Sequence, residues 1–375
     1  MLNKYFKVTC AGLVASLSLV VGSAASAQGA RQMIYANYQP PSNAANQFGY
    51  GPYFDAVTKD TNNELTFDLV TGGALLGAKA MLPGLRDGIA DGGFVVSIYT
   101  PSDLPRDSML SEMALTGENP AVMAAAVAET VLLDCPDCQA EWENAGIAYV
   151  APYATLPYYL MCKGDLQSSA DIQGKKVRAV GAWGKWVNEL GGVPVNLPSS
   201  EVYQAIERGQ ADCALGSAAW LKQLSLIDLI DTIIDVPMGT FHGGGYVIYS
   251  KKTWDKLSAD QRTALIANAP IAMSGEILRG YLPEDREAKE MAREKGIKFL
   301  APDEALLEKL ATYKAKEASQ VAGIAEGRGV ENASDIIATF LENKDKWDGL
   351  SAEFGVDPKK YEEVLYREIY SKIQP

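Results

Sequence analysis

The residue best suited to binding chemistry in this sequence is Arg178, which stands near the end of an expected strand at 176–180. A guanidinium stays charged at physiological pH, and its planar fork matches a carboxylate through two parallel hydrogen bonds. At the end of a strand on a cleft wall, this group can bind the anionic end of a small molecule. The alternative is a structural ion pair, for which Asp212 is the candidate acid.

Four cysteines outside the first 27 residues could form disulfides or bind a metal. Cys135 and Cys138 have the spacing of a redox motif, but no βαβ start accompanies them, so a structural disulfide is favoured over catalysis. Zinc is disfavoured because the single histidine, His242, is distant and no second CxxC occurs. Three pairings stay open, among them Cys162 with Cys213 across neighbouring expected strands.

The first 27 residues have the layout of a secretory signal. Lys4 and Lys7 precede the apolar run 11–21, which is shorter than the ~20 residues of a spanning helix. Small residues end at Ala27, so cleavage is expected there, with release into the periplasm. The net charge of −13 becomes more negative by two once these lysines are removed, which argues against a nucleic acid partner.

The rest of the chain is longer than one hydrophobic core usually serves, so two lobes are expected. Apolar segments of strand length alternate with helical patterns in two successive series, which predicts an α/β fold with largely parallel sheets. Strands are expected at 33–38, 64–70, 93–98 and 147–151, and then at 156–162, 176–180, 193–197 and 211–215. Helices are expected at 46–58, 78–87, 120–145 and 183–190.

Strand character returns at 242–250, and helical patterns follow at 258–269, 284–328 and 335–375. The chain thus leaves the first lobe, builds a second and comes back, and two crossings make a hinge. The expected division is a signal at 1–27, the first lobe at 28–152 and 241–283, the second lobe at 153–240, a long bridging helical region at 284–330 and a C-terminal helical segment at 331–375.

Four motifs in a fixed order carry a family resemblance. They are TGGALLG followed by DGIAD (71–77 and 87–91), DIQGKKVR (171–178), SSEVYQAIERGQAD (199–212), and His242 followed by YVI and WDKL (246–248 and 254–257). Together, over roughly residues 31–330, they resemble the solute receptors of tripartite ATP-independent periplasmic (TRAP) transporters of the dicarboxylate-receptor (DctP) type. The resemblance implies a two-lobed periplasmic binding protein with hinge strands and a long helix across both lobes.

The resemblance also implies a function and partners. Such receptors deliver a small organic anion to two integral-membrane permease subunits driven by an ion gradient, without a cofactor and without chemistry on the ligand. A homodimer is compatible with the sequence. Rival interpretations are the receptor of an ATP-driven (ABC-type) importer or of a signalling system, and a secreted hydrolase, although no G-x-S-x-G elbow and no clustered metal ligands occur.

The resemblance places Arg178 where these receptors hold their main carboxylate anchor, and it puts Tyr158 where some members have a second arginine. Tyr38 and Val96 fall where other members have polar contacts. Tryptophans at helical spacing more often belong to a core, so Trp183 and Trp186 are weaker candidates than Trp220. The expected ligand-binding residues are Arg178, Trp220, Phe241, Tyr38, Tyr158, Trp183, Gly216 and Ser199.

One cation among aromatic and apolar walls suits a monocarboxylate with a hydrophobic body, such as a 2-oxo, branched or aromatic acid. A dicarboxylate would want a second cation. Because aromatic rings also accommodate positive groups, a zwitterionic compatible solute remains an alternative ligand.

Overall fold

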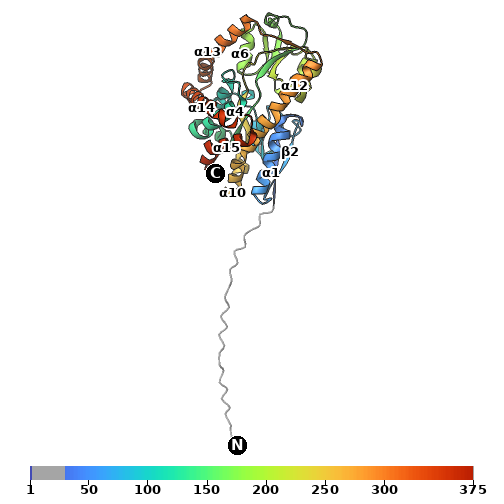
Figure 1. The fold of residues 1–375 in the computed structure, drawn as a ribbon. Coiled ribbons are helices and arrows are strands. Elements are labelled where there is room, and N and C mark those ends of the chain that lie inside the picture. Colours follow the sequence, from blue (N-terminus) through green and yellow to red (C-terminus); the bar gives the residue numbers. More distant parts are fainter. Residues whose placement is uncertain (2–29, 375) are drawn as a thin grey trace.

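The computed structural model of the protein describes Met1 and residues 30–374. The expected signal segment, apart from Met1, and its cleavage site after Ala27 lie outside the described residues. The fold is α/β and has two lobes, each built around its own sheet, which confirms the expected fold class (Figure 1). The C-terminal helices lie on the first lobe, at the end opposite α6.

The first sheet has five strands in the order β2-β1-β3-β10-β4. β1 is parallel to β2 and β3, whereas β10 is antiparallel to β3 and β4. Parallel strands therefore end at the same edge, and the segments after β1 and β3 meet there. The bounds are β1 Arg31–Ala36, β2 Leu65–Val70, β3 Gly92–Val95, β4 Ile147–Ala154 and β10 His242–Ser250.

The second sheet has six strands in the order β11-β9-β5-β8-β6-β7. β6 is parallel to β7 and β8, and β5 is antiparallel to β8. The end of β8 therefore lies beside the start of β5, with Ser217 opposite Tyr158. The bounds are β5 Tyr158–Cys162, β6 Lys176–Arg178, β7 Val193–Val195, β8 Cys213–Ser217, β9 Thr232–Ile234 and β11 Lys298–Leu300.

Helices cover both sheets, and several begin at side chains that cap them. Asn119 accepts hydrogen bonds from the N–H groups of Ala121 and Val122 at the start of α4, and Ser258 and Gln261 form a capping box at α10. The α-helices of the first lobe are α1 Gly51–Asp60, α2 Met81–Asp87, α3 Pro105–Glu112, α4 Pro120–Glu129, α5 Pro136–Asn144, α9 Lys251–Trp254, α10 Ala259–Ala267, α11 Ala269–Ser274, α14 Ala333–Phe354 and α15 Pro358–Glu368. Those of the second are α6 Ala182–Glu189, α7 Val202–Glu207 and α8 Trp220–Gln223.

Shorter helical turns complete the elements. Those of 3₁₀ type are η2 Ser97–Tyr99, η4 Ser169–Ile172, η5 Ser199–Glu201, η6 Leu226–Asp228 and η8 Tyr370–Lys372. Those of π type are η1 Ala45–Tyr50, η3 Thr130–Asp134 and η7 Gly275–Tyr281.

Two helical segments run between the lobes. α11, η7 and α12 (Leu282–Glu294) follow one another without a break, so that Ser274 contacts Glu362 in the first lobe while Asp285 contacts Ser217 in the second. α13 (Glu304–Gly327) packs on α3 and α14, and the Tyr313 hydroxyl donates to the carbonyl of Ala182 in α6. The region expected to be helical from 284 to 330 is interrupted by β11, which pairs with β9.

Two disulfides form in the structure. Cys135 is bonded to Cys138 at the start of α5, and Cys162 is bonded to Cys213. The second bond joins directly opposite residues of β5 and β8. It therefore fastens β5 and β8 together at the ends away from the cavity-lining Tyr158.

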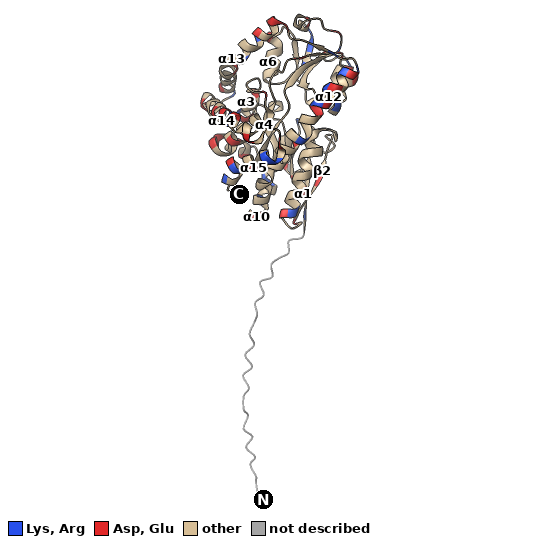
Figure 2. Cartoon of the chain, viewed as in Figure 1, with Lys and Arg blue, Asp and Glu red and all other residues tan. Residues whose placement is uncertain are grey.

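Charged residues gather on outer helices such as α12 and α15, while the strands of both sheets are mostly uncharged (Figure 2). Among residues 30–374, no helix combines the length and apolarity needed to cross a bilayer.

Candidate functional site

A small cavity lies where the two sheets face each other, and its walls come from both lobes. Most of its residues follow or precede a strand end, as expected for a ligand site at the carboxyl edge of α/β sheets. The aromatic lining residues are Tyr38, Tyr99, Tyr153, Tyr158, Trp220 and Phe241. The aliphatic ones are Val96, Ile98 and Val180, and the polar ones are Gln39, Thr155, Arg178 and Ser199.

Arg178, the last residue of β6, is 1% exposed. Its Nε donates to the carbonyl of Leu197 (3.0 Å), Nη1 to the carbonyl of Leu215 (3.3 Å) and Nη2 to the Tyr99 hydroxyl (3.3 Å). Among the described residues, no carboxylate lies within 4.0 Å of this guanidinium. The alternative partner Asp212 instead accepts a hydrogen bond from the backbone N–H of Lys176.

A guanidinium has five N–H donors, and three of those of Arg178 are used by the chain. One donor on each terminal nitrogen remains, which is the number that a carboxylate needs for a two-point contact. The guanidinium carbon lies 5.3 Å from the ring centre of Trp220, which is within cation–π range. The cation is therefore held by neutral groups only.

Gly216 allows Trp220 to take this position. A Cβ on Gly216 would lie 2.2 Å from the Trp220 ring, so that only glycine fits beneath the ring in β8. Tyr158 stands beside Trp220, with ring centres 5.3 Å apart. Burial raises the pKa of the Tyr158 hydroxyl far above its usual range, although Arg178 acts in the opposite direction. Its phenol stays neutral.

Trp183 and Trp186 form the layer behind the cavity. The Trp183 ring stacks on Tyr158 at 4.4 Å, and its Nε1 donates to the carbonyl of Met238. Trp186 is fully buried against Tyr313. The structure thus places Trp183 as support for a wall residue rather than among the residues that line the cavity.

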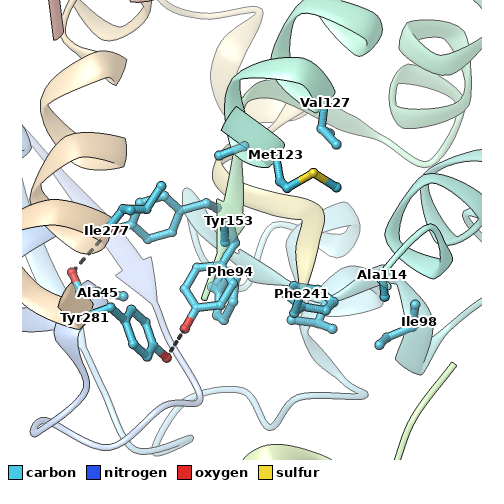
Figure 3. Close-up of a cluster of buried hydrophobic side chains, with 14 of the residues drawn as sticks. Ala45, Phe94, Ile98, Ala114, Met123, Val127, Tyr153, Phe241, Ile277 and Tyr281 are labelled. Atoms are coloured by element: carbon cyan, nitrogen blue, oxygen red, sulfur yellow. Dashed lines mark hydrogen bonds between the residues drawn. The ribbon is translucent and has the colours of Figure 1, made fainter. Parts of the chain in front are cut away.

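The first lobe contributes a stack of aromatic rings. Tyr38 lies flat against Phe94 with ring centres 5.3 Å apart, and Phe94 contacts Tyr153. Figure 3 shows Phe94 beside Tyr153 and the hydroxyls of Tyr153 and Tyr281 joined by a hydrogen bond. The Tyr153 hydroxyl is therefore occupied by the bridging helical segment.

Tyr99 and Gln39 were not expected from the sequence, and both join the lobes at the cavity. The Tyr99 hydroxyl accepts from Arg178 and from the backbone N–H of Ser199 (3.1 Å). Gln39 Nε2 donates to the Ser199 hydroxyl (3.0 Å). Ser199 does not cap the helix that follows it, and its side chain accepts from Gln39 in the other lobe. No local pattern marks Tyr99 or Gln39.

The TGGALLG motif positions Gln39. Gly72 and Gly73 both have positive φ, and their N–H groups donate to the carbonyls of Gln39 (2.8 Å) and Asn37 (3.2 Å). The turn therefore fixes the backbone after β1, where the first lobe meets the cavity.

The cavity has about 20 Å³ of free volume, which is room for roughly one water molecule. An organic acid is larger, so it can enter only when the lobes move apart or the rings turn. Two segments that cross between the lobes are paired: the N–H of Thr155 donates to the carbonyl of Phe241, and the N–H of Tyr158 donates to that of Gly239. These paired segments lie outside the central strands of both sheets, as hinge segments of two-lobed binding proteins do.

Metal or acid–base chemistry finds little support in residues 30–374. They contain no group of three or more His, Cys, Asp or Glu side chains arranged to hold a metal ion. His242 is fully buried, stacks on Phe340 and hydrogen-bonds to the carbonyl of Thr240. Burial lowers the pKa of His242 to about 4, so the ring is neutral at pH 7.

Solved structures with the same fold are solute receptors. A TRAP periplasmic solute-binding protein from Bordetella bronchiseptica, solved with bound (R)- and (S)-mandelate, is 22% identical with a TM-score of 0.71, over 84% of this chain and 99% of that one. A TRAP solute-binding protein from Rhodoferax ferrireducens T118, solved with copurified benzoate, is 16% identical with a TM-score of 0.73, over 86% and 99%.

A third structure, from a marine metagenome, is a TRAP solute-binding protein solved with 3-hydroxybenzoate. It is 19% identical to this chain with a TM-score of 0.74, over 85% of this chain and 99% of that one. The family profile of bacterial extracellular solute-binding proteins, family 7 (DctP), matches residues 39–320, which is most of the chain. The chain therefore belongs to the DctP family of TRAP solute-binding proteins, which are receptors rather than enzymes.

Proposed function

We propose that this protein is a periplasmic receptor for a small monocarboxylate with an apolar or aromatic body, and that Arg178 anchors the carboxylate. The receptor delivers its ligand to two integral-membrane permease subunits driven by an ion gradient. Cleavage of the signal after Ala27 releases it into the periplasm. Closure of the lobes removes water from the ion pair and creates the shape that the permease recognises.

The observation that carries the proposal is the isolation of the Arg178 guanidinium. It is 1% exposed, and its partners in the described chain are two carbonyls and one hydroxyl. A buried charge without a counter-ion costs several kcal/mol, and a ligand carboxylate offsets this cost. The two unused N–H donors of Arg178 supply the hydrogen bonds.

The rest of the lining supports one carboxylate rather than two. Arg178 is the only Lys, Arg or His side chain among the described residues that line the cavity. Six of its thirteen lining residues carry aromatic rings, which suit an apolar ligand body. The three similar receptors bind mandelate, benzoate and 3-hydroxybenzoate, each an aromatic acid with a single carboxylate.

Calorimetric titration of the mature protein against a panel of acids tests this function. The panel contains phenylacetate, benzoate, 4-methyl-2-oxopentanoate, succinate and glycine betaine. We expect an aromatic, branched or oxo monocarboxylate to bind at least about tenfold more tightly than succinate and to be recovered unchanged. Tighter binding of succinate would contradict the monocarboxylate assignment, tighter binding of betaine would support the zwitterion instead, and chemical turnover of any acid would contradict a receptor.

A further inference from the structure

Three polar groups of residues that line the cavity make no well-formed hydrogen bond within the described chain, although the Tyr38 hydroxyl lies near those of Tyr99 and Ser199 and the Thr155 hydroxyl lies near that of Tyr158. They are the hydroxyl of Tyr38, the carbonyl oxygen Oε1 of Gln39 and the hydroxyl of Thr155. The three residues are 3%, 4% and 1% exposed, so bulk water does not serve these atoms either. Tyr38 and Gln39 follow β1, whereas Thr155 lies on the segment that joins β4 to β5. Two separate parts of the chain therefore bring unpartnered groups to one cavity.

An unpartnered buried polar group is costly, at about 1–3 kcal/mol each, and most such groups in folded proteins find a partner. Neighbouring polar groups of this cavity are satisfied. Ser199 accepts from the Nε2 of Gln39, and Tyr99 accepts from Arg178. The amide of Gln39 is thus held at its nitrogen end by the second lobe, while its oxygen has no hydrogen-bond partner in the described chain.

The chemistry of these atoms specifies what a ligand must offer. The Gln39 oxygen only accepts hydrogen bonds, so a ligand must donate to it, whereas the hydroxyls of Tyr38 and Thr155 can donate or accept. A ligand hydroxyl does both. A keto oxygen only accepts, a methyl group does neither, and a second carboxylate would bring a charge without a second cation in the lining.

We propose that the ligand is a hydroxy monocarboxylate, whose hydroxyl binds among Tyr38, Gln39 and Thr155 while its carboxylate binds Arg178. This inference rests on the proposed function and narrows its ligand class. A site that hydrogen-bonds a ligand hydroxyl discriminates strongly against an analogue without it, because its buried polar groups then stay unpaired.

The test is a titration of the mature protein with ligands that differ in one substituent. On the carbon next to the carboxylate, (R)- and (S)-mandelate carry a hydroxyl, phenylglyoxylate carries a keto oxygen and phenylacetate carries only hydrogen. 3-Hydroxybenzoate differs from benzoate by one hydroxyl on the ring. We expect at least one hydroxy acid to bind about tenfold or more tightly than both its plain and, where present, its keto analogue. Equal affinities would overturn the hydroxyl inference and leave the monocarboxylate function standing. No binding by any acid would overturn both.

Two variants test whether the ligand hydroxyl binds beside Gln39 and Thr155. Gln39→Met keeps the length of the side chain but removes the amide, and Thr155→Val removes the hydroxyl with little change of shape. We expect one or both to reduce the preference for the hydroxy acid over its plain analogue to about twofold or less. A ratio of affinities is used because any effect on lobe closure applies to both ligands. Gln32→Met, on the exposed side of β1, is the matched control and should keep the preference. An unchanged preference in both cavity variants would overturn the assignment.

Discussion

Two arginines in this protein sit over tryptophan rings, one in each lobe, with closely similar local contacts. Arg178 lies 5.3 Å from the ring centre of Trp220, and Arg262 lies 6.0 Å from that of Trp254. Each donates from Nε to a backbone carbonyl, of Leu197 (3.0 Å) and of Trp254 (3.2 Å). Among residues 30–374, neither has a carboxylate within 4.0 Å.

The two pairs differ in their access to water. Arg262 is partly exposed on α10, so water can solvate its positive charge. Arg178 is 1% exposed, so nothing outside the protein does this for it. An arginine over a tryptophan is therefore not an anion site by itself. Burial at the lobe interface is therefore the feature on which the proposed carboxylate-binding role of Arg178 depends.

Replacing the two arginines with glutamine gives the largest expected difference. In Arg178→Gln, affinity for the best acid should fall at least about 100-fold, because truncating one partner of a buried charge pair costs roughly 2–5 kcal/mol. In Arg262→Gln, affinity should stay within about twofold. Calorimetric titration measures both, and circular dichroism checks that both variants fold. Equal losses in the two variants would contradict the distinction between the sites.

Lysine at the same two positions separates charge from geometry. Arg178→Lys keeps the positive charge but removes the planar fork and the Nε contact with Leu197, so we expect affinity to fall roughly 10- to 100-fold. Arg262→Lys is the matched control, with affinity unchanged. If Arg178→Lys bound the acid as well as the native protein does, two-point recognition of the carboxylate would be excluded.

Replacing Trp220 should lower ligand affinity, whereas replacing Trp254 should lower the stability of the fold. Trp220→Leu removes the ring over Arg178, and we expect the affinity for aromatic acids to fall about tenfold. Trp254→Leu removes a ring that stacks on Tyr249, with ring centres 5.8 Å apart, so it should lower the free energy of unfolding by roughly 1–2 kcal/mol without changing affinity. Chemical denaturation and titration of both variants provide the comparison. Loss of ligand affinity in Trp254→Leu would contradict the expected difference between the two tryptophans.

Much of the fold could be predicted because hydrophobic periodicity is local. Most strands of both sheets were expected within a few residues of their observed bounds. The misses were short elements that depend on distant partners. β9 and β11 have three residues each and exist because they pair with each other, and β11 lies in a charged stretch rich in helix formers. α3 has little amphipathic pattern, because it is buried on nearly every side.

The residues of the site also differ in how far the sequence alone could identify them. Arg178 could be selected because its strand motif is continuous in sequence and its chemistry is distinctive. Tyr99, Gln39 and Thr155 could not, because each is one ordinary polar residue whose importance comes from facing the other lobe or the hinge. Trp183 was also selected for its type and its nearness to Arg178, and it packs against Tyr158 outside the residues that line the cavity. Sequence identifies an unusual group, whereas its surroundings require the fold.

Glu317 extends the comparison to a buried group that can lose its charge. It is 1% exposed on α13, and it accepts from the N–H of Leu115 (2.8 Å) and the hydroxyl of Thr116 (2.6 Å). Burial raises the pKa of the Glu317 carboxyl from 4.5 to about 7. Arginine cannot discharge in this way, because its pKa is too high. The folded protein therefore retains a proton on Glu317 at a pH where the unfolded chain has released it.

The sign of the resulting pH dependence follows from linkage. Between about pH 4.5 and 7 the folded state binds more protons than the unfolded state, so Glu317 makes stability fall as pH rises through this window. Each unit of pKa corresponds to about 1.4 kcal/mol, so the rise of the Glu317 pKa from 4.5 to about 7 contributes about 3.5 kcal/mol at most. Glu317→Gln should reduce the fall in melting temperature between pH 5 and 7.5, whereas Glu326→Gln, exposed on the same helix, should not.

Other buried carboxyls limit how flat that profile becomes, among them Glu276 and Glu284, whose pKa values burial also raises. Burial raises the pKa of Glu141 to about 7 and that of Asp107 to about 6, so a residual slope of the same sign should persist in Glu317→Gln. The expected result is a partial reduction of the slope, measured by thermal denaturation in buffers of equal ionic strength. If the melting temperature of Glu317→Gln fell with pH as steeply as that of the native protein, the donors from Leu115 and Thr116 would already stabilise the charged carboxylate. Burial alone would then not determine the free energy of this charge.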